Sequence, residues 1–129
     1  MRNLKQKPGS KNCVAIVAAM AFDCEVDEFE RFAGECGEGY SDSDFVRFAL
    51  SKKCLVGMPF SAPVGDELTL RMSVYDTKAY VIVKGENGLH AVYWDGQYIY
   101  DPNPTNGDRR DLKDYKILFW YPILKLVDK

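Results

Sequence analysis

Three residues that could act together in nucleophilic catalysis lie far apart in the chain: Cys13, Asp101 and the only histidine, His90. A cysteine nucleophile needs its thiolate form, a histidine that takes up and returns a proton, and a third group that orients the imidazole. Such a set transfers acyl groups, and most simply hydrolyses an amide bond through a thioester. For each residue alone a structural role is the simpler explanation, so catalysis is indicated only if the fold brings the three together.

The stretch that ends at Asp101 predicts a β-hairpin. Two strand-like runs flank the Asp-Gly pair at 95–96, and Asp-Gly favours a two-residue turn because such a turn needs positive φ. With this turn Trp94 pairs with Gln97, and His90 lies directly opposite Asp101, with Cβ atoms about 5 Å apart. The sequence therefore predicts a hydrogen bond between the His90 ring and the Asp101 carboxylate.

Cys13 lies where a buried helix is expected to begin. The run 14–22, VAIVAAMAF, is apolar on all sides, which is typical of a helix buried all round. Either Ser10 or Asn12 is the expected N-cap. Both choices place Cys13 in the first turn, where unpaired N–H groups and the positive end of the helix dipole favour the thiolate. Cys24, Cys36 and Cys54 have no comparable setting.

The rest of the first half predicts two more helices. One covers VDEFERFA, from Val26, with Asp27 as a possible cap. The other follows Ser41, and Asp44 three residues later forms an acidic version of the capping box. After Cys54 the prolines and glycines of residues 55–67 predict mostly irregular structure.

The second half predicts an antiparallel sheet, because β-branched and aromatic runs alternate with turn residues. Pro122 indicates an edge strand or a bulge in the last of these runs. The fold class is therefore α+β, a single domain over residues 1–129 with helices first and the sheet after them. The expected strands are Ala79–Lys84, Leu89–Trp94, Gln97–Asp101 and Ile117–Leu126.

Composition limits the possible partners and cofactors. With 47% apolar and 28% charged residues the chain is globular, and a net charge of −2 gives no electrostatic footprint for nucleic acid. The N-terminus lacks the apolar core of a signal peptide, and the longest apolar run is too short to cross a bilayer. We therefore expect a cytoplasmic protein with no membrane partner and with free thiols. The chain contains no CxxC pair that would indicate a zinc site. The acyl-transfer chemistry described above requires no cofactor.

The same residues resemble a known family. The stretch KQKPGSKNCVAIVAAMAF (5–22), with His90 and the YDP at 100–102, is similar to papain-like cysteine peptidases. The nearest likeness is to the double-glycine bacteriocin-processing peptidases of ABC exporters and their stand-alone relatives. There a glutamine precedes the cysteine at the start of a long apolar helix, and a histidine on a strand is followed by an aspartate. GSKNC at 9–13 also faintly resembles the nucleophile loop of ovarian-tumour-type deubiquitinases, but lacks its aspartate.

The resemblance implies a papain-like fold with the nucleophile on the buried helix, and a role for each site residue. Cys13 would be the nucleophile, His90 the general base and then acid, and Asp101 the group that holds the imidazole. Gln6 and the Cys13 backbone N–H would form the oxyanion hole, with Asn12 or Asn3 as alternatives to Gln6. The substrate would be a peptide or protein, with a small or glycine-rich segment at the cleaved bond.

Two other functions stay open on the sequence alone. No glycine follows Cys13, where these peptidases commonly have one, so the chain could be a binding module whose triad is inactive. The same triad could also perform another acyl transfer, such as transglutamination or deamidation, because triad geometry does not define the acceptor.

Overall fold

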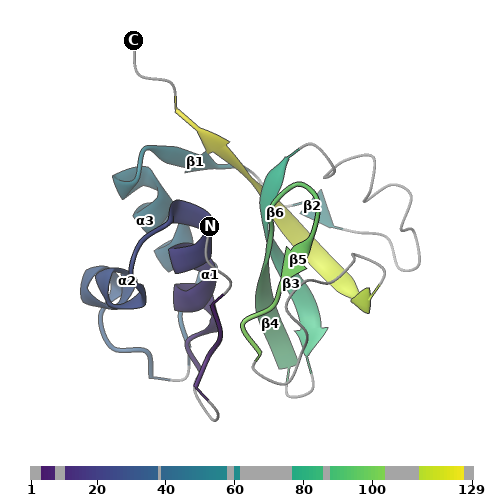
Figure 1. Ribbon diagram of the computed structural model, residues 1–129, viewed down its shortest axis with the longest axis horizontal. Helices are drawn as coiled ribbons and strands as arrows, with labels where there is room; N and C mark the ends of the chain where they lie inside the picture. The colour runs from purple at the N-terminus through teal and green to yellow at the C-terminus, as the bar shows by residue number, and fades with distance from the viewer. Residues whose placement is uncertain are drawn as a thin grey trace.

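The computed structural model describes residues 4–7, 11–37, 39–57, 60–61, 77–85, 88–103 and 114–126. Helices come first and an antiparallel sheet follows, so the predicted α+β class is confirmed (Figure 1). The helices are α1 (Cys13–Phe22), α2 (Val26–Ala33) and α3 (Asp42–Ser51). The strands are β1 (Cys54–Val56), β2 (Phe60–Ser61), β3 (Lys78–Gly85), β4 (Gly88–Trp94), β5 (Ile99–Tyr100) and β6 (Ile117–Lys125).

The sheet has the order β1-β6-β3-β4-β5, and β2 also pairs with β6. All three helices lie on one side of it, as Figure 1 shows, and α1 packs against β4. Because side chains alternate along a strand, β3 and β4 contribute to two cores. Tyr80 and Tyr93 face the helices, whereas Val81 and Trp94 belong to a second core on the opposite face.

Helix α1 is the central element of the helical layer. Every residue from Val14 to Met20 is buried, as the all-round apolar pattern predicts. The helix begins at Cys13 with Asn12 at the N-cap, which agrees with one of the two caps expected, while Ser10 lies outside the described residues. The helices in the described part of the chain lack the length and apolar character that a membrane span requires.

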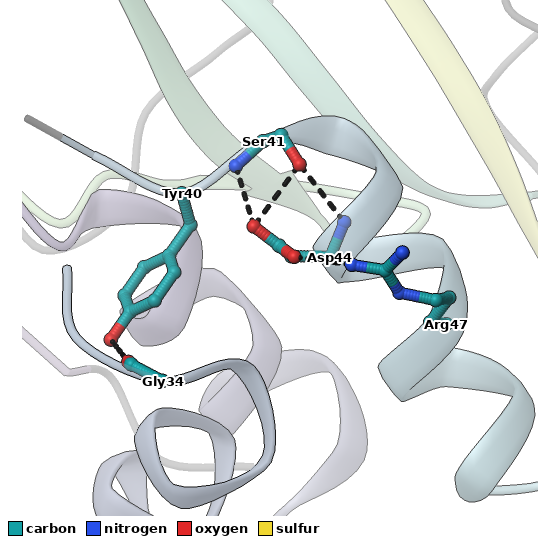
Figure 2. A network of polar contacts seen from close by, with 5 residues as sticks. All are labelled: Gly34, Tyr40, Ser41, Asp44 and Arg47. Atoms are coloured by element: carbon teal, nitrogen blue, oxygen red, sulfur yellow. Dashed lines mark hydrogen bonds and ion pairs between the residues drawn. The ribbon is translucent and has the colours of Figure 1, made fainter.

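The start of α3 follows the predicted capping box. The Ser41 hydroxyl accepts a hydrogen bond from the Asp44 N–H, and the Asp44 carboxylate accepts one from the Ser41 N–H (Figure 2). Arg47 pairs with the same carboxylate at 2.7 Å, and the Tyr40 hydroxyl donates to the Gly34 carbonyl at 2.8 Å. These bonds fix the entry to α3 and tie it to the end of α2. The cap predicted for α2 is wrong, because Glu25 is the N-cap and Asp27 lies in the first turn.

Two short strands lie in the segment that was expected to be mostly irregular. Both β1 and β2 pair with β6, so β6 is an interior strand and the edge-strand alternative at Pro122 is wrong. The other alternative, a bulge in this run, agrees with the register shift between β3 and β6, where Ile82 pairs with Phe119 but Val83 pairs with Ile117. Pro122 is tolerated there because β1 ends and β2 has not yet begun opposite it. Gly57 donates its N–H to the Pro122 carbonyl at 2.8 Å. A Cβ at Gly57 would lie 2.7 Å from the proline ring, so only glycine fits this approach.

The hairpin between β4 and β5 has a longer turn than predicted. Tyr93 pairs with Tyr100 and Trp94 with Ile99, so the connection is four residues long and the predicted pairing of Trp94 with Gln97 is wrong. The Asp95 carboxylate accepts hydrogen bonds from the N–H groups of residues 97 and 98. An aspartate that bonds forward to its own backbone stabilises this wider turn. The register moves by two residues, which keeps every side chain on its predicted face.

Candidate active site

Cys13 is the first residue of α1, and the His90 ring and the backbone N–H groups of Ala91 and Val14 lie close enough to its sulfur to lower the thiol pKa. Neither the Asn12 side chain nor an acidic residue caps the first turn. The positive end of the helix dipole is therefore available to a negative charge on the sulfur. The sequence placed Cys13 correctly, because a polar cap followed by an apolar run defines where the helix begins.

The site lies at an edge of the sheet. Among the described residues β5 pairs with β4 only through Tyr93 and Trp94, so the first residues of β4 have no strand partner on that side. The Ala91 backbone of β4 is one of the groups that lower the Cys13 pKa, so the thiol lies close to this strand. Helix α1 packs against β4, and this packing brings the thiol at the start of α1 beside His90.

His90 and Asp101 are in direct contact, as predicted, although the register is not the predicted one. The His90 Nε2 atom lies 2.6 Å from Asp101 Oδ1. In the observed register Asp101 falls opposite Val92 rather than His90, so the two side chains are diagonal neighbours on one face. A diagonal pair is within reach of a side chain as long as histidine. Since Nε2 faces Asp101, the remaining ring nitrogen, Nδ1, is the one that faces the thiol.

Asp101 is fully buried at 0% exposure, and donors reach both of its oxygens. Oδ1 also accepts the Asn103 N–H at 2.8 Å, and Oδ2 accepts the Tyr115 hydroxyl at 2.6 Å. Tyr115 was not among the predicted site residues. Its position just before β6 becomes informative only when β6 and β5 are placed in space, and no spacing in the sequence indicates it.

The hydrogen bonds outweigh the effect of burial on all three ionisable groups. Burial alone would raise the pKa of Cys13, but the bonds from His90 and Ala91 and the imidazolium charge bring it below its ordinary value. For His90, burial is outweighed by the bonds to Asp101 and Cys13 and by their charges, and the pKa rises to about 9. The Asp101 pKa falls well below its ordinary value, because the bonds from His90, Tyr115 and Asn103 outweigh its burial. Together these shifts favour a thiolate–imidazolium pair over a neutral thiol and imidazole.

The N-terminal segment runs beside Asp101. The Gln6 N–H donates to the Pro102 carbonyl at 2.7 Å, and the Lys5 ammonium donates to the Asp101 carbonyl at 2.7 Å. The backbone of Gln6 is thereby fixed next to the triad, and its side chain is half-buried. Asn12, one alternative to Gln6, directly precedes Cys13 at the helix start. Asn3, the other, lies outside the described residues.

The remaining cysteines lie elsewhere in the fold, and none of the four cysteines forms a disulfide. Cys24 and Cys54 are buried, whereas Cys36 is half-buried and lies 3.3 Å from the Lys11 carbonyl. Within the described ranges no group of three or more His, Cys, Asp or Glu side chains could hold a metal ion.

No protein-family model matches the chain, and no curated protein is similar enough to count as a match.

Proposed function

We propose that this protein is a thiol-dependent hydrolase with a papain-like arrangement, which cleaves a peptide or other amide bond through a thioester intermediate. The observation that supports this is the chain of contacts from Cys13 to His90 and from His90 to Asp101. A buried structural histidine needs a hydrogen-bond partner but does not need a thiol on its second ring nitrogen. The arrangement has all three parts that a cysteine nucleophile requires.

In the first half-reaction the Cys13 thiolate attacks the carbonyl carbon of the substrate amide and forms a C–S bond. The imidazolium of His90 then gives its Nδ1 proton to the amide nitrogen as the C–N bond breaks. The amine leaves, and the acyl group remains on the sulfur as a thioester. Asp101 stays ionised throughout and stabilises the imidazolium.

In the second half-reaction His90, now neutral, takes a proton from a water molecule through Nδ1. The water oxygen attacks the thioester carbon, the C–S bond breaks, and the carboxylic acid product leaves. The thiolate and the imidazolium are restored. Charge that develops on the carbonyl oxygen in both steps would be met by the Cys13 N–H at the start of α1 and by the side-chain amide of Gln6 or Asn12.

The substrate class we propose is a peptide or protein with small residues, such as glycine, at the cleaved bond. This part rests on the resemblance of residues 5–22 and 100–102 to the exporter-type peptidases.

The first experiment measures how fast each cysteine is alkylated by iodoacetamide between pH 5 and 9, with the four sites separated by mass spectrometry. We expect Cys13 to react fastest at pH 6, because its pKa is lowered and only the thiolate reacts. In His90→Ala the rate at Cys13 should fall about tenfold or more at that pH, since a pKa rise of one unit corresponds to tenfold. Cys36, also half-buried, is the internal comparison and should not respond to His90→Ala.

The second experiment incubates the protein with a pool of peptides that contain glycine pairs and follows new carboxyl termini by mass spectrometry, with Cys13→Ala as the blank. Cleavage that requires Cys13 supports hydrolysis. Transfer of the acyl group to an added amine without cleavage products would replace hydrolysis with transamidation. A reactive Cys13 that never forms an acyl-enzyme would instead favour the binding module, and a Cys13 indifferent to His90→Ala would exclude the triad.

A further inference from the structure

Tyr115 is the side chain that reaches the Asp101 carboxylate from outside the hairpin. Its hydroxyl donates to Oδ2 at 2.6 Å, and its ring packs against the second core, the cluster of Val81, Val92 and Trp94. The residue lies at the end of the connection into β6, close to where Lys116 accepts a hydrogen bond from the N–H of Lys84 on β3. The residue that follows Tyr115 is therefore bonded to β3.

A carboxylate on an aspartate has little intrinsic preference for its own rotation, because the torsion that turns it is broad. Bonds to Oδ1 alone would leave the group free to rock about that oxygen. Here the His90 ring and the Asn103 N–H bind Oδ1 while the Tyr115 hydroxyl binds Oδ2. Donors on both oxygens fix the plane of the group and keep a lone pair of Oδ1 directed at Nε2.

We propose that Tyr115 is a positioning residue, which holds the Asp101 carboxylate in the orientation that supports His90 during the acyl transfer. This inference rests on the proposed function for its catalytic meaning. Tyr115 does not touch the thiol or the reacting atoms; it acts through Asp101.

The test uses Tyr115→Phe, which keeps the ring that packs on the second core and removes only the hydroxyl. His90 is the only histidine of the chain, so its imidazole titration can be followed by NMR without ambiguity. If the carboxylate loses its orientation, the imidazolium loses part of its partner, and the His90 pKa should fall from about 9 by about one unit.

The matched control is Tyr121→Phe, which removes a hydroxyl that donates to another carboxylate, Asp42, at 2.7 Å. This variant should leave the His90 titration and the Cys13 rate unchanged, and circular dichroism should show both variants folded. An unchanged His90 pKa in Tyr115→Phe would overturn the inference. So would a raised one, because Tyr115 would then only weaken the charge of Asp101. So would an equal fall in both variants, which would indicate general loosening.

The titration also separates this inference from the proposed function. It reports the orientation of Asp101 whether or not Cys13 attacks a substrate. A lowered His90 pKa in Tyr115→Phe in a protein that forms no acyl-enzyme would establish the positioning and reject the hydrolase. Acyl transfer at an undiminished rate in Tyr115→Phe would support the hydrolase and reject the positioning role of Tyr115.

Discussion

Two carboxylates in this domain, Asp42 and Asp101, are held in nearly the same way, but only one of them lies beside groups that can react. Each accepts a tyrosine hydroxyl on Oδ2, from Tyr121 at 2.7 Å for Asp42 and from Tyr115 at 2.6 Å for Asp101. On Oδ1 the two differ. Asp42 accepts a second tyrosine, Tyr80, at 2.7 Å, whereas Asp101 accepts the His90 ring.

The Oδ1 partner decides what each carboxylate can do. Burial and the nearby charge and hydrogen bond of Asp42 raise the pKa of Tyr80 well above its ordinary value, so Tyr80 keeps its proton at any physiological pH. His90, with a pKa of about 9, gives and takes a proton far more easily, and its other nitrogen faces a thiol. Asp42, Tyr80 and Tyr121, here called the Asp42 cluster, therefore link α3 to the paired strands β3 and β6. The Asp101 cluster consists of Asp101, Tyr115, His90 and Cys13, and in it His90 carries a proton that can be transferred.

The largest effect should come from removing the nucleophile at the end of the Asp101 cluster. In Cys13→Ala we expect peptide hydrolysis to fall on the order of 10⁴-fold or more, because the members of such a triad act as a unit. The free energy of unfolding should change by only about 1 kcal/mol, since the side chain is small and half-buried. Product formation by mass spectrometry and urea unfolding measure the two quantities.

The control for this variant is Cys36→Ala, which removes another half-buried thiol close to the start of α1. It should keep full hydrolysis. If Cys36→Ala lost activity to the same extent, the assignment of Cys13 as the nucleophile would be wrong.

Next in size is the exchange of each carboxylate for an amide. Asp101→Asn removes the charge that supports the imidazolium, and the His90 pKa should fall by about 1–3 units. Hydrolysis and Cys13 alkylation at pH 6 should drop about tenfold or more. Asp42→Asn should leave both unchanged. NMR titration of His90 in the two variants makes the comparison directly, and an equal response would mean that the clusters are not separate.

The pH dependence of the wild type tests the same difference. Protonated His90 donates to the leaving amine, so hydrolysis should fall as pH rises through about 9, the His90 pKa, by about tenfold per pH unit above it. On the acid side the rate should fall as the Cys13 thiolate is protonated, below the ordinary thiol pKa. A stopped assay between pH 5 and 10.5 measures both limbs. A rate that kept rising above pH 9 would exclude imidazolium as the acid.

Local patterns in the sequence were enough to predict much of this site. Either expected cap, Ser10 or Asn12, followed by the apolar run placed Cys13 in the first turn of α1, where it lies. Alternation along β4 placed His90 and Asp101 on one face. That placement was right although the turn was not, because a register error of two residues leaves the faces unchanged.

The features that the sequence did not indicate are those that depend on distant contacts. The turn is wider than predicted because the Asp95 carboxylate accepts hydrogen bonds from the N–H groups of Gln97 and Tyr98, which competes with the two-residue turn that Asp-Gly favours. β1 forms because β6 offers it a partner, and Leu55 pairs with Leu124 across the full length of the second half of the chain. Tyr115 reaches Asp101 because the fold brings the residues just before β6 next to the end of β5. Each of these is decided by tertiary structure rather than by local preference.

A smaller effect is expected when the buried tyrosine of the Asp42 cluster loses its hydroxyl. Tyr80 is 1% exposed, stacks on Phe45 at 4.2 Å between ring centroids, and donates to Asp42. Tyr80→Phe keeps the stacking and removes the hydrogen bond, so unfolding should cost about 1 kcal/mol less. Cys13 alkylation should stay the same. The Cys13 charge contributes to the raised Tyr80 pKa, so a changed alkylation rate would show that the two clusters communicate.

The smallest effect should come from Tyr121→Phe. Tyr121 is half-buried, so water can replace its hydroxyl as a donor to Asp42 in the variant, and the loss of unfolding free energy at pH 7 should be about 0.5 kcal/mol. The pH dependence is more informative. Burial, the hydrogen bond to Asp42 and the charge of Asp42 raise the Tyr121 pKa from 10.0 to about 12.

A tyrosine that holds its proton more tightly in the folded state stabilises the fold fully below pH 10 and loses that contribution as pH rises towards 12. The wild type should therefore lose more stability than Tyr121→Phe between pH 9 and 11, as measured by urea unfolding at each pH. Tyr98→Phe, at an exposed position in the β4–β5 turn, controls for removal of a hydroxyl in general. If Tyr121→Phe lost stability with the same pH slope as the wild type, its hydroxyl would not be part of the Asp42 cluster, and Asp42 would be held through Tyr80 on one oxygen while Asp101 is held on both.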